Sequence, residues 1–102
     1  MGQLYTSGLW IVTPGNEGPF VEAWRDLAEW TAATVEGGTW AKLLQDDSEH
    51  RRFLSFGPWP SVDAVQAWRD SDGFRQRVGV IRSLLESFEP RTMHAVVEVG
   101  TI

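Results

Sequence analysis

The sequence predicts a single α+β domain in which helices cover one face of an antiparallel sheet. Two observations predict it: the chain of 102 residues has the usual size of one domain, and its strand and helix patterns alternate in the order β-α-β-β-α-β without linkers or repeats. A domain of this size buries roughly 60 to 65% of the surface that its unfolded chain exposes, so a large apolar face on it tends to need a partner. We therefore treat residues 1–102 as one domain and expect a homodimer.

The first strand and the first helix follow from local residue types. Residues 7–13 are a β-branched and aromatic run that ends at Pro14-Gly15-Asn16, which is typical of a strand and a turn. Pro19 then opens a helix, where its missing N–H costs nothing, and Gly37-Gly38 ends it. Its apolar residues recur at helical spacing on one face: Phe20, Trp24, Leu27, Ala28, Thr31 and Val35.

A hairpin is predicted next. Residues 39–45 and 52–56 have strand patterns, and the polar segment 46–49 between them has the length of a hairpin turn. Apolar residues occur on both faces of these strands. The hairpin is therefore expected inside a sheet that is covered on both sides, or against a partner.

The last third of the chain predicts a broken helix and a final strand. Ser61 is a good helix N-cap after Pro58-Trp59-Pro60, and Ser71-Asp72-Gly73 interrupts the helix. A second segment is predicted from Phe74 to about Ser87, with Pro90 as its stop. Residues 92–99 then alternate as a strand, with Met93, Ala95, Val97 and Val99 on one face. This element order is that of the ferredoxin-like fold.

Composition excludes several classes of function. A net charge of −5 repels nucleic acid and anionic membranes, and the absence of cysteine excludes disulfides and thiol chemistry. Six of the twelve aromatic residues are tryptophan, which favours pockets and interfaces. The N-terminus lacks the pattern of a signal peptide and no stretch is apolar enough to span a bilayer, so we expect a cytoplasmic protein.

Three segments together resemble the antibiotic biosynthesis monooxygenase (ABM) domain family: Phe53–Ser61, Ala64–Trp68 and Ser71–Phe74. The resemblance implies a dimer whose two sheets face each other as an α/β barrel, with a pocket between the sheet and helices of each subunit. Some members of the family are cofactor-free oxygenases that convert phenolic polyketides to quinones, and others degrade heme. A fold with several activities does not by itself select one of them.

Residue matches within the family separate its branches. The catalytic histidine of the heme-degrading branch falls here at Val78 and its asparagine at about Gly8, which argues against heme degradation. In the quinone-forming branch the tryptophan matches Trp59, whereas the asparagine falls at Ser55 and the tyrosine at Val65. The match to the quinone-forming branch is incomplete.

Two hypotheses remain open. The first is a cofactor-independent monooxygenase, without a bound cofactor, that acts on a small aromatic compound of the polyketide or quinol type. The second is a non-catalytic dimeric domain that binds a small aromatic or apolar molecule. His94 is the candidate catalytic base, and a metal site is not expected because the two histidines lie 44 positions apart without paired carboxylates. The predicted substrate-binding residues are Trp10, Ser55, Trp59, Trp68, Phe74 and Arg77.

Overall fold

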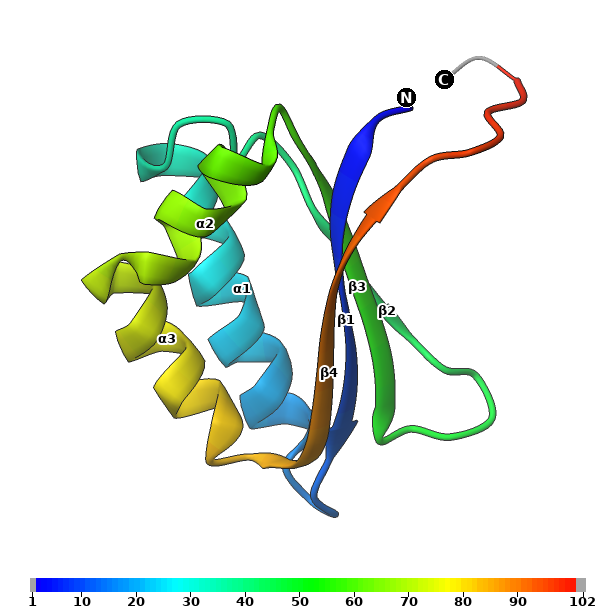
Figure 1. Cartoon of the computed structure of the whole chain (residues 1–102). Coiled ribbons are helices and arrows are strands. Elements are labelled where there is room, and N and C mark those ends of the chain that lie inside the picture. Colours follow the sequence, from blue (N-terminus) through cyan, green and yellow to red (C-terminus); the bar gives the residue numbers. More distant parts are fainter. Residues whose placement is uncertain (1, 101–102) are drawn as a thin grey trace.

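The computed structural model describes residues 2–100 as two layers, with three helices on one face of a four-stranded antiparallel sheet (Figure 1). The strands are β1 (Leu4–Val12), β2 (Lys42–Gln45), β3 (Arg52–Trp59) and β4 (Leu85–His94), and the helices are α1 (Glu17–Thr34), α2 (Val62–Asp70) and α3 (Asp72–Arg82). The strand order is β2-β3-β1-β4, so β1 and β3 are central. This confirms the predicted α+β ferredoxin-like class, and the sheet of one chain is not closed.

The core lies between the central strands and the helices. Phe20 of α1 and Ile81 of α3 have no exposed surface, and Phe53 of β3 is 2% exposed. The ring of Phe20 lies 4.8 Å from that of Phe53 and 5.5 Å from that of Trp10 on β1. Side chains alternate along a strand, so one face of β1 enters this core while Tyr5, Ser7, Leu9 and Ile11 lie on the outer face of the sheet.

The last strand corrects the prediction. The helix predicted to reach Ser87 ends at Arg82, and the strand predicted at 92–99 runs from Leu85 to His94. Phe88 lies opposite Trp10 and stacks on its ring, with centroids 4.0 Å apart and planes 12° apart. Pro90 lies inside this strand, opposite Gly8, instead of stopping a helix. An edge strand tolerates proline because one of its sides has no hydrogen-bonded neighbour.

Other boundaries also differ from the prediction. β1 begins at Leu4 instead of Ser7, β2 begins at Lys42 instead of Thr39, and β3 continues through Pro58 to Trp59. After β4, residues 95–100 extend beyond the sheet and are not a strand (Figure 1). Val96 and Val97 on this extension are 92% and 76% exposed, so the predicted strand face of Met93, Ala95, Val97 and Val99 does not form.

Ser61 caps α2 as predicted, and Ser71 in the predicted helix break caps α3, which begins at Asp72 instead of Phe74. The Ser61 hydroxyl accepts a hydrogen bond from the Ala64 N–H at the start of α2, and the Ser71 hydroxyl accepts one from Phe74 at the start of α3. Gly73 lies in the first turn of α3, and a Cβ there would lie 2.2 Å from the ring of Trp30, so glycine permits the contact between α3 and α1. Within residues 2–100, none of these helices combines the length and apolar character that a membrane span requires.

Candidate functional site

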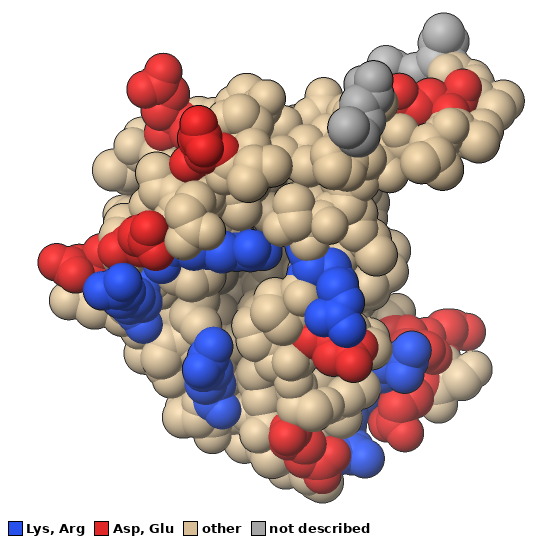
Figure 2. All heavy atoms as spheres, in the orientation of Figure 1, with Lys and Arg blue, Asp and Glu red and all other residues tan. Residues whose placement is uncertain are grey.

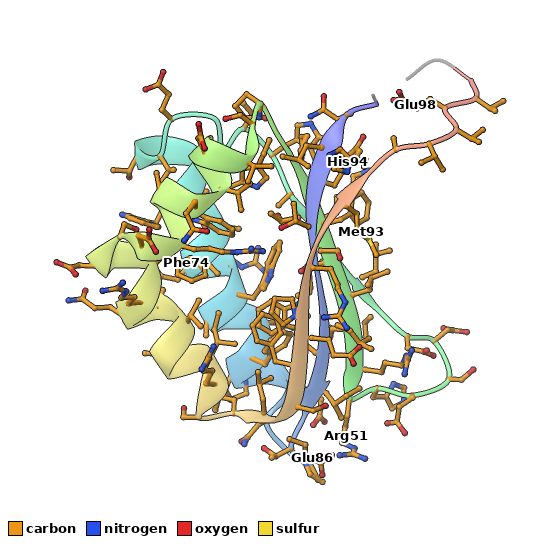
Figure 3. All side chains as sticks on the ribbon, in the orientation of Figure 1. Arg51, Phe74, Glu86, Met93, His94 and Glu98 are labelled. Atoms are coloured by element: carbon orange, nitrogen blue, oxygen red, sulfur yellow. The ribbon has the colours of Figure 1, made fainter. Side chains whose placement is uncertain are left out.

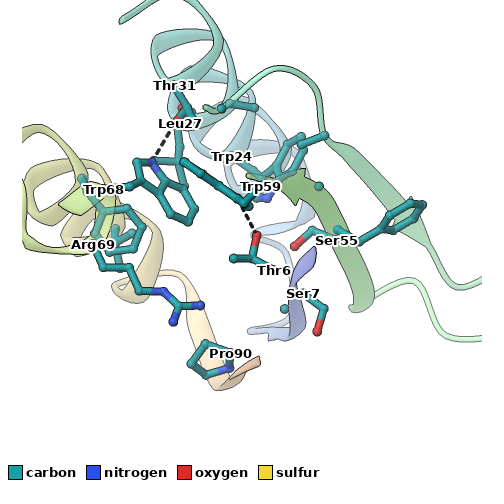
Figure 4. Close-up of a pocket in the computed structure, with 18 of the residues that line it drawn as sticks. Thr6, Ser7, Trp24, Leu27, Thr31, Ser55, Trp59, Trp68, Arg69 and Pro90 are labelled. Atoms are coloured by element: carbon teal, nitrogen blue, oxygen red, sulfur yellow. Dashed lines mark hydrogen bonds between the residues drawn. The ribbon is translucent and has the colours of Figure 1, made fainter. Parts of the chain in front are cut away.

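A cavity of about 440 Å³ lies between the sheet and the helical layer (Figure 4). Its floor on the two central strands consists of short residues, because Thr6 lies opposite Gly57 and Gly8 lies opposite Ser55. Ala28, Ala32 and Thr31 of α1 line the same space from the helical layer. The volume is within the range of about 300 to 1,000 Å³ that is usual for sites of small organic ligands.

Aromatic side chains form the walls of this cavity. Five of the six tryptophans line it, namely Trp10, Trp24, Trp40, Trp59 and Trp68. The indole of Trp68 lies 4.7 Å from the ring of Trp59 and 4.6 Å from that of Phe74. The tryptophan-rich composition is therefore concentrated at one site, whose walls suit a planar apolar ligand.

Three of these indoles have their N–H groups occupied by hydroxyls of the protein. Trp10 Nε1 donates to Ser55 Oγ at 2.9 Å, and Trp59 Nε1 donates to Thr6 Oγ1 at 3.1 Å. Trp68 Nε1 donates to Thr31 Oγ1 at 3.0 Å (Figure 4). Thr31 Oγ1 itself donates to the carbonyl of Leu27 at 2.7 Å. The three indoles therefore present their rings rather than their N–H groups to a ligand.

The hydroxyls of Ser55 and Thr6 differ from that of Thr31. Each accepts a hydrogen bond from an indole, and a hydroxyl carries one proton that it can donate at the same time. Both residues line the floor of the cavity. These two hydroxyls are therefore placed to donate hydrogen bonds to an oxygen atom of a ligand that lies on the floor.

Two arginines add positive charge to this cavity. Arg69 in the last turn of α2 and Arg82 in the last turn of α3 both line it. Arg69 Nη1 donates to Thr92 Oγ1 on β4 at 3.3 Å. Burial lowers the pKa of Arg69, although a guanidinium stays protonated at neutral pH. The cavity thus combines apolar walls with cationic groups.

Five of the seven predicted site residues come together here: Trp10, Ser55, Trp59, Trp68 and Phe74. His94 does not line this cavity. It is exposed on β4 opposite Leu4, in a separate shallow hollow beside Gln3 and Pro60, and Figure 3 shows it at a distance from Phe74. His94 is therefore not placed to act as a base on a ligand in the cavity.

Arg77 also lies outside the lining of the cavity and connects two helices instead. Its Nε is 3.3 Å from the Asp26 carboxylate of α1, and its guanidinium lies over the ring of Trp30 at 4.4 Å from the centroid. Its Nη1 donates to the carbonyl of Gly73 at 3.1 Å. Arg77 therefore covers the indole of Trp30 and connects α3 to α1, which is a structural role.

Several residues that line the cavity were not predicted from the sequence. Thr6 preceded the predicted strand, Thr31 counted only as part of an apolar stripe, and Arg69 carried no signal except its place directly after Trp68. The useful signal was the number of tryptophans, because each buried indole N–H needs an acceptor. Pairing each indole with its hydroxyl, however, requires the register of β1 and β3.

The cavity does not fit the chemistry of heme degradation. Val78 lines it at the position of the axial histidine, and neither His50 nor His94 does. A Cβ on Gly8 would lie 2.9 Å from Trp10 Nε1, so an asparagine there would displace the indole. Within residues 2–100, no group of three histidine, aspartate or glutamate side chains could hold a metal ion.

Comparisons with known proteins agree with this architecture. A family model described as antibiotic biosynthesis monooxygenase matches residues 8–79. No curated protein sequence matches the chain.

Solved structures show the same fold at low sequence identity. SnoaB, a cofactor-independent oxygenase from Streptomyces nogalater, is 17% identical with a TM-score of 0.89, over 99% of this chain and 100% of that one. A conserved protein from Methanosarcina mazei is 17% identical with a TM-score of 0.82, over 92% of this chain and 93% of the other. An antibiotic biosynthesis monooxygenase is 19% identical with a TM-score of 0.80, over 92% and 99%.

Proposed function

This chain belongs to the antibiotic biosynthesis monooxygenase family, and we propose that it is a cytoplasmic, cofactor-independent monooxygenase acting on a small planar aromatic compound. The substrate class is a phenol or quinol of the polyketide type. The observation that carries the proposal is the cavity, where aromatic walls surround a floor with two hydroxyl donors, Ser55 and Thr6. The likeness to SnoaB, itself a cofactor-independent oxygenase, supports it through the fold.

The proposed reaction needs an electron-rich substrate, because the substrate itself is the reductant in a cofactor-independent oxygenation. A phenolate gives one electron to dioxygen, the two radicals combine at a ring carbon, and loss of water leaves a quinone. One phenol and one dioxygen thus yield one quinone and one water. Ser55 and Thr6 would donate hydrogen bonds to the phenolate oxygen and favour its ionised form, and the indole walls would exclude water.

A non-catalytic binding domain is the second candidate, and one observation favours it. His94, the candidate base, lies outside the cavity. Within residues 2–100, Glu29 is the only carboxylate that lines the cavity, and it is exposed. Under this hypothesis the domain holds an aromatic molecule without transforming it.

Oxygen uptake separates the two hypotheses. With a panel of dihydroxynaphthalenes and anthrones, the protein should consume one dioxygen per substrate and produce quinone absorbance. Ser55→Ala should slow this turnover by about tenfold or more, because one donor to the developing oxyanion is lost. Ser87→Ala, an exposed serine on β4, should not change the rate. If ligands quench tryptophan fluorescence but no oxygen is consumed above the rate in buffer, the binding-domain hypothesis replaces the first.

We further propose that a second copy of the chain covers the outer face of the sheet. Leu44, Leu54 and Leu9 lie opposite one another on β2, β3 and β1 and form an apolar row across that face. Leu44 and Leu54 are 48% and 45% exposed, and Met93 on β4 is 52% exposed. Figure 3 shows Met93 on the side of the sheet that faces away from the helices. A self-complementary apolar face of this kind favours a symmetric dimer.

Leu54→Asp should convert such a dimer into a folded monomer. Leu54 lies on the outer face and is half exposed in one chain, so the charge is tolerated in the monomer but would be buried without a partner in the dimer. Sedimentation velocity at micromolar concentration should show the change. Val80→Asp, on the outside of α3 and 60% exposed, should leave the dimer intact.

Val97→Asp tests the extension after β4 by the same measurement. Because Val97 is 76% exposed, the variant should stay folded. Val97→Asp should dissociate the dimer if residues 95–100 take part in the interface, and should leave the dimer intact if they do not. A wild-type chain that sediments as a stable monomer would contradict the dimer proposal.

A further inference from the structure

Two arginines at the cavity have no carboxylate partner among the residues that the structure describes. Five arginines lie within 4.0 Å of a carboxylate oxygen: Arg25, Arg51, Arg52, Arg77 and Arg91. Between residues 2 and 100, no such partner is found for Arg69, Arg75 or Arg82, and of these three Arg69 and Arg82 line the cavity. The chain has fourteen acidic and nine basic residues, so a shortage of carboxylates does not explain this.

We propose that Arg69 is a specificity-determining residue that binds an ionised oxygen group of the substrate at the mouth of the cavity. The ligand class is a planar aromatic molecule that carries a carboxylate or a phenolate. Arg82, which also lines the cavity, adds a second positive charge to it. This inference rests on the proposed function for the identity of the site, and it adds the charge of the molecule that the site selects.

The position of Arg69 supports this role. It follows Trp68 at the end of α2, and its hydrogen bond to Thr92 reaches from the helical layer to the edge strand β4. Figure 4 shows its guanidinium directed away from α2, in the space between Trp68 and Pro90. The hydrogen bond from Arg69 to Thr92 uses one of the five guanidinium N–H groups. The neighbouring Pro90 has no N–H that could bind a ligand in place of Arg69. Donors therefore remain for an anion that enters the cavity.

The surface around the cavity is also positively charged. Figure 2 shows basic side chains bordering the hollow between the helical layer and the sheet, whereas acidic side chains lie mostly toward the periphery. A chain with a net charge of −5 thus presents a cationic rim at its cavity. Such a rim raises the local concentration of an anionic ligand near the cavity.

The energetics of Arg69 also favour an anionic ligand. Burial lowers its pKa, which means that the charge is partly removed from water without a counter-ion. A carboxylate can accept two parallel hydrogen bonds from a guanidinium, and the apolar side chains of Trp68 and Phe74 beside it would strengthen the attraction. A bound anion would therefore supply the interaction that the folded chain itself lacks.

Arg69 has a simpler possible role, since a basic residue in the last turn of a helix interacts favourably with the helix dipole. That role predicts a small loss of stability on substitution and no change in ligand preference. The hydrogen bond to Thr92 instead directs the guanidinium across the cavity mouth. Ligand preference is thus the readout that distinguishes the two roles.

The experiment measures quenching of tryptophan fluorescence by anthraquinone-2-carboxylate and by its neutral carboxamide. The wild-type protein should bind the carboxylate about tenfold or more tightly than the amide. Arg69→Gln should bind both equally, and Arg69→Lys should keep part of the preference. Arg75→Gln, which removes an unpaired arginine outside the cavity, should keep all of it. A third probe, 2-hydroxyanthraquinone, is titrated below and above its own pKa, and preference for its ionised form identifies a phenolate site.

Selective binding of either anion that disappears in Arg69→Gln supports the proposal. The proposal is overturned if the wild-type protein binds the charged and neutral probes equally, or binds none of them. It is also overturned if the preference for the anion survives in Arg69→Gln and this variant melts at the same temperature as the wild type. Oxygen uptake is measured separately. Anion selectivity without oxygen uptake would reject the monooxygenase and leave this inference standing, whereas oxygen uptake without selectivity would do the reverse.

Discussion

Replacing Trp68 with alanine should lower the free energy of unfolding by about 3 to 5 kcal/mol. The indole packs between Trp59 and Phe74. It contacts the core around Phe20 and Phe53 and also a second buried cluster formed by Leu4, Trp59 and Val65. Its N–H also bonds to Thr31, which links α2 to α1. The alanine variant therefore loses ring contacts and a hydrogen bond at once, and urea denaturation followed by circular dichroism measures the loss.

Two further variants divide this effect into its parts. Trp68→Phe keeps a ring but loses the donor to Thr31, and should cost about 1 kcal/mol for the hydrogen bond in addition to the smaller ring. Trp40→Ala removes a cavity-lining indole that is 48% exposed, and should cost much less than Trp68→Ala. A stability loss for Trp68→Ala no larger than that for Trp40→Ala would contradict the packing role.

The same Trp68→Ala variant tests contact with the ligand. One face of the indole lines the cavity, so the folded fraction of the variant should bind an aromatic ligand about 1 to 3 kcal/mol more weakly. Quenching of the remaining tryptophans by the anthraquinone probes measures the affinity. Unchanged affinity together with a large stability loss would leave Trp68 as a core residue only.

Partly filling the cavity should weaken ligand binding with little effect on the fold. Ala28 on α1 lines the cavity, and phenylalanine in its place would occupy space that is otherwise open to a ligand. We expect ligand affinity to fall by about tenfold or more, which corresponds to at least about 1.4 kcal/mol. Oxygen uptake should fall in parallel if the cavity is the active site. Fluorescence titration and an oxygen electrode measure the two effects.

A matched substitution on the same helix controls for this change. Ala33 is exposed and does not line the cavity, so Ala33→Phe adds the same side chain outside the site. It should leave both affinity and oxygen uptake near the wild-type values. Unchanged affinity and activity in Ala28→Phe would show that ligands bind elsewhere.

The sequence by itself determined the elements whose signals are local. The first strand and helix, the hairpin, the Ser61 cap and the helix break at Ser71-Asp72-Gly73 depend on turn residues, periodicity and side-chain hydroxyls that lie within a few positions of one another. Ser61 caps α2 in the structure as its context predicts, and Ser71, predicted as part of the helix break, caps α3. Four aromatic residues of the cavity, Trp10, Trp59, Trp68 and Phe74, were predicted as well, because the tryptophan count and the family resemblance pointed to them.

Only the tertiary structure decided the end of the chain. Leu85 and Phe88 continue a helical periodicity from α3, and nothing local distinguishes that pattern from a strand start. The stacking of Phe88 on Trp10, more than seventy positions away, and the pairing of β4 with β1 make this segment a strand. Long-range pairing also explains why Pro90 is accommodated at the edge of the sheet instead of ending a helix.

The polar groups of the site were decided in the same way. The hydroxyl partners of Trp10 and Trp59 depend on which residues of β1 and β3 lie opposite each other on one face of the sheet. This pairing register cannot be read from the sequence. His94 and Arg77 looked suitable by residue type, but β4 carries the first to a separate hollow and the contact with Trp30 holds the second against α1. Residue type limits which chemistry is possible, whereas the packing of distant segments decides which side chains meet.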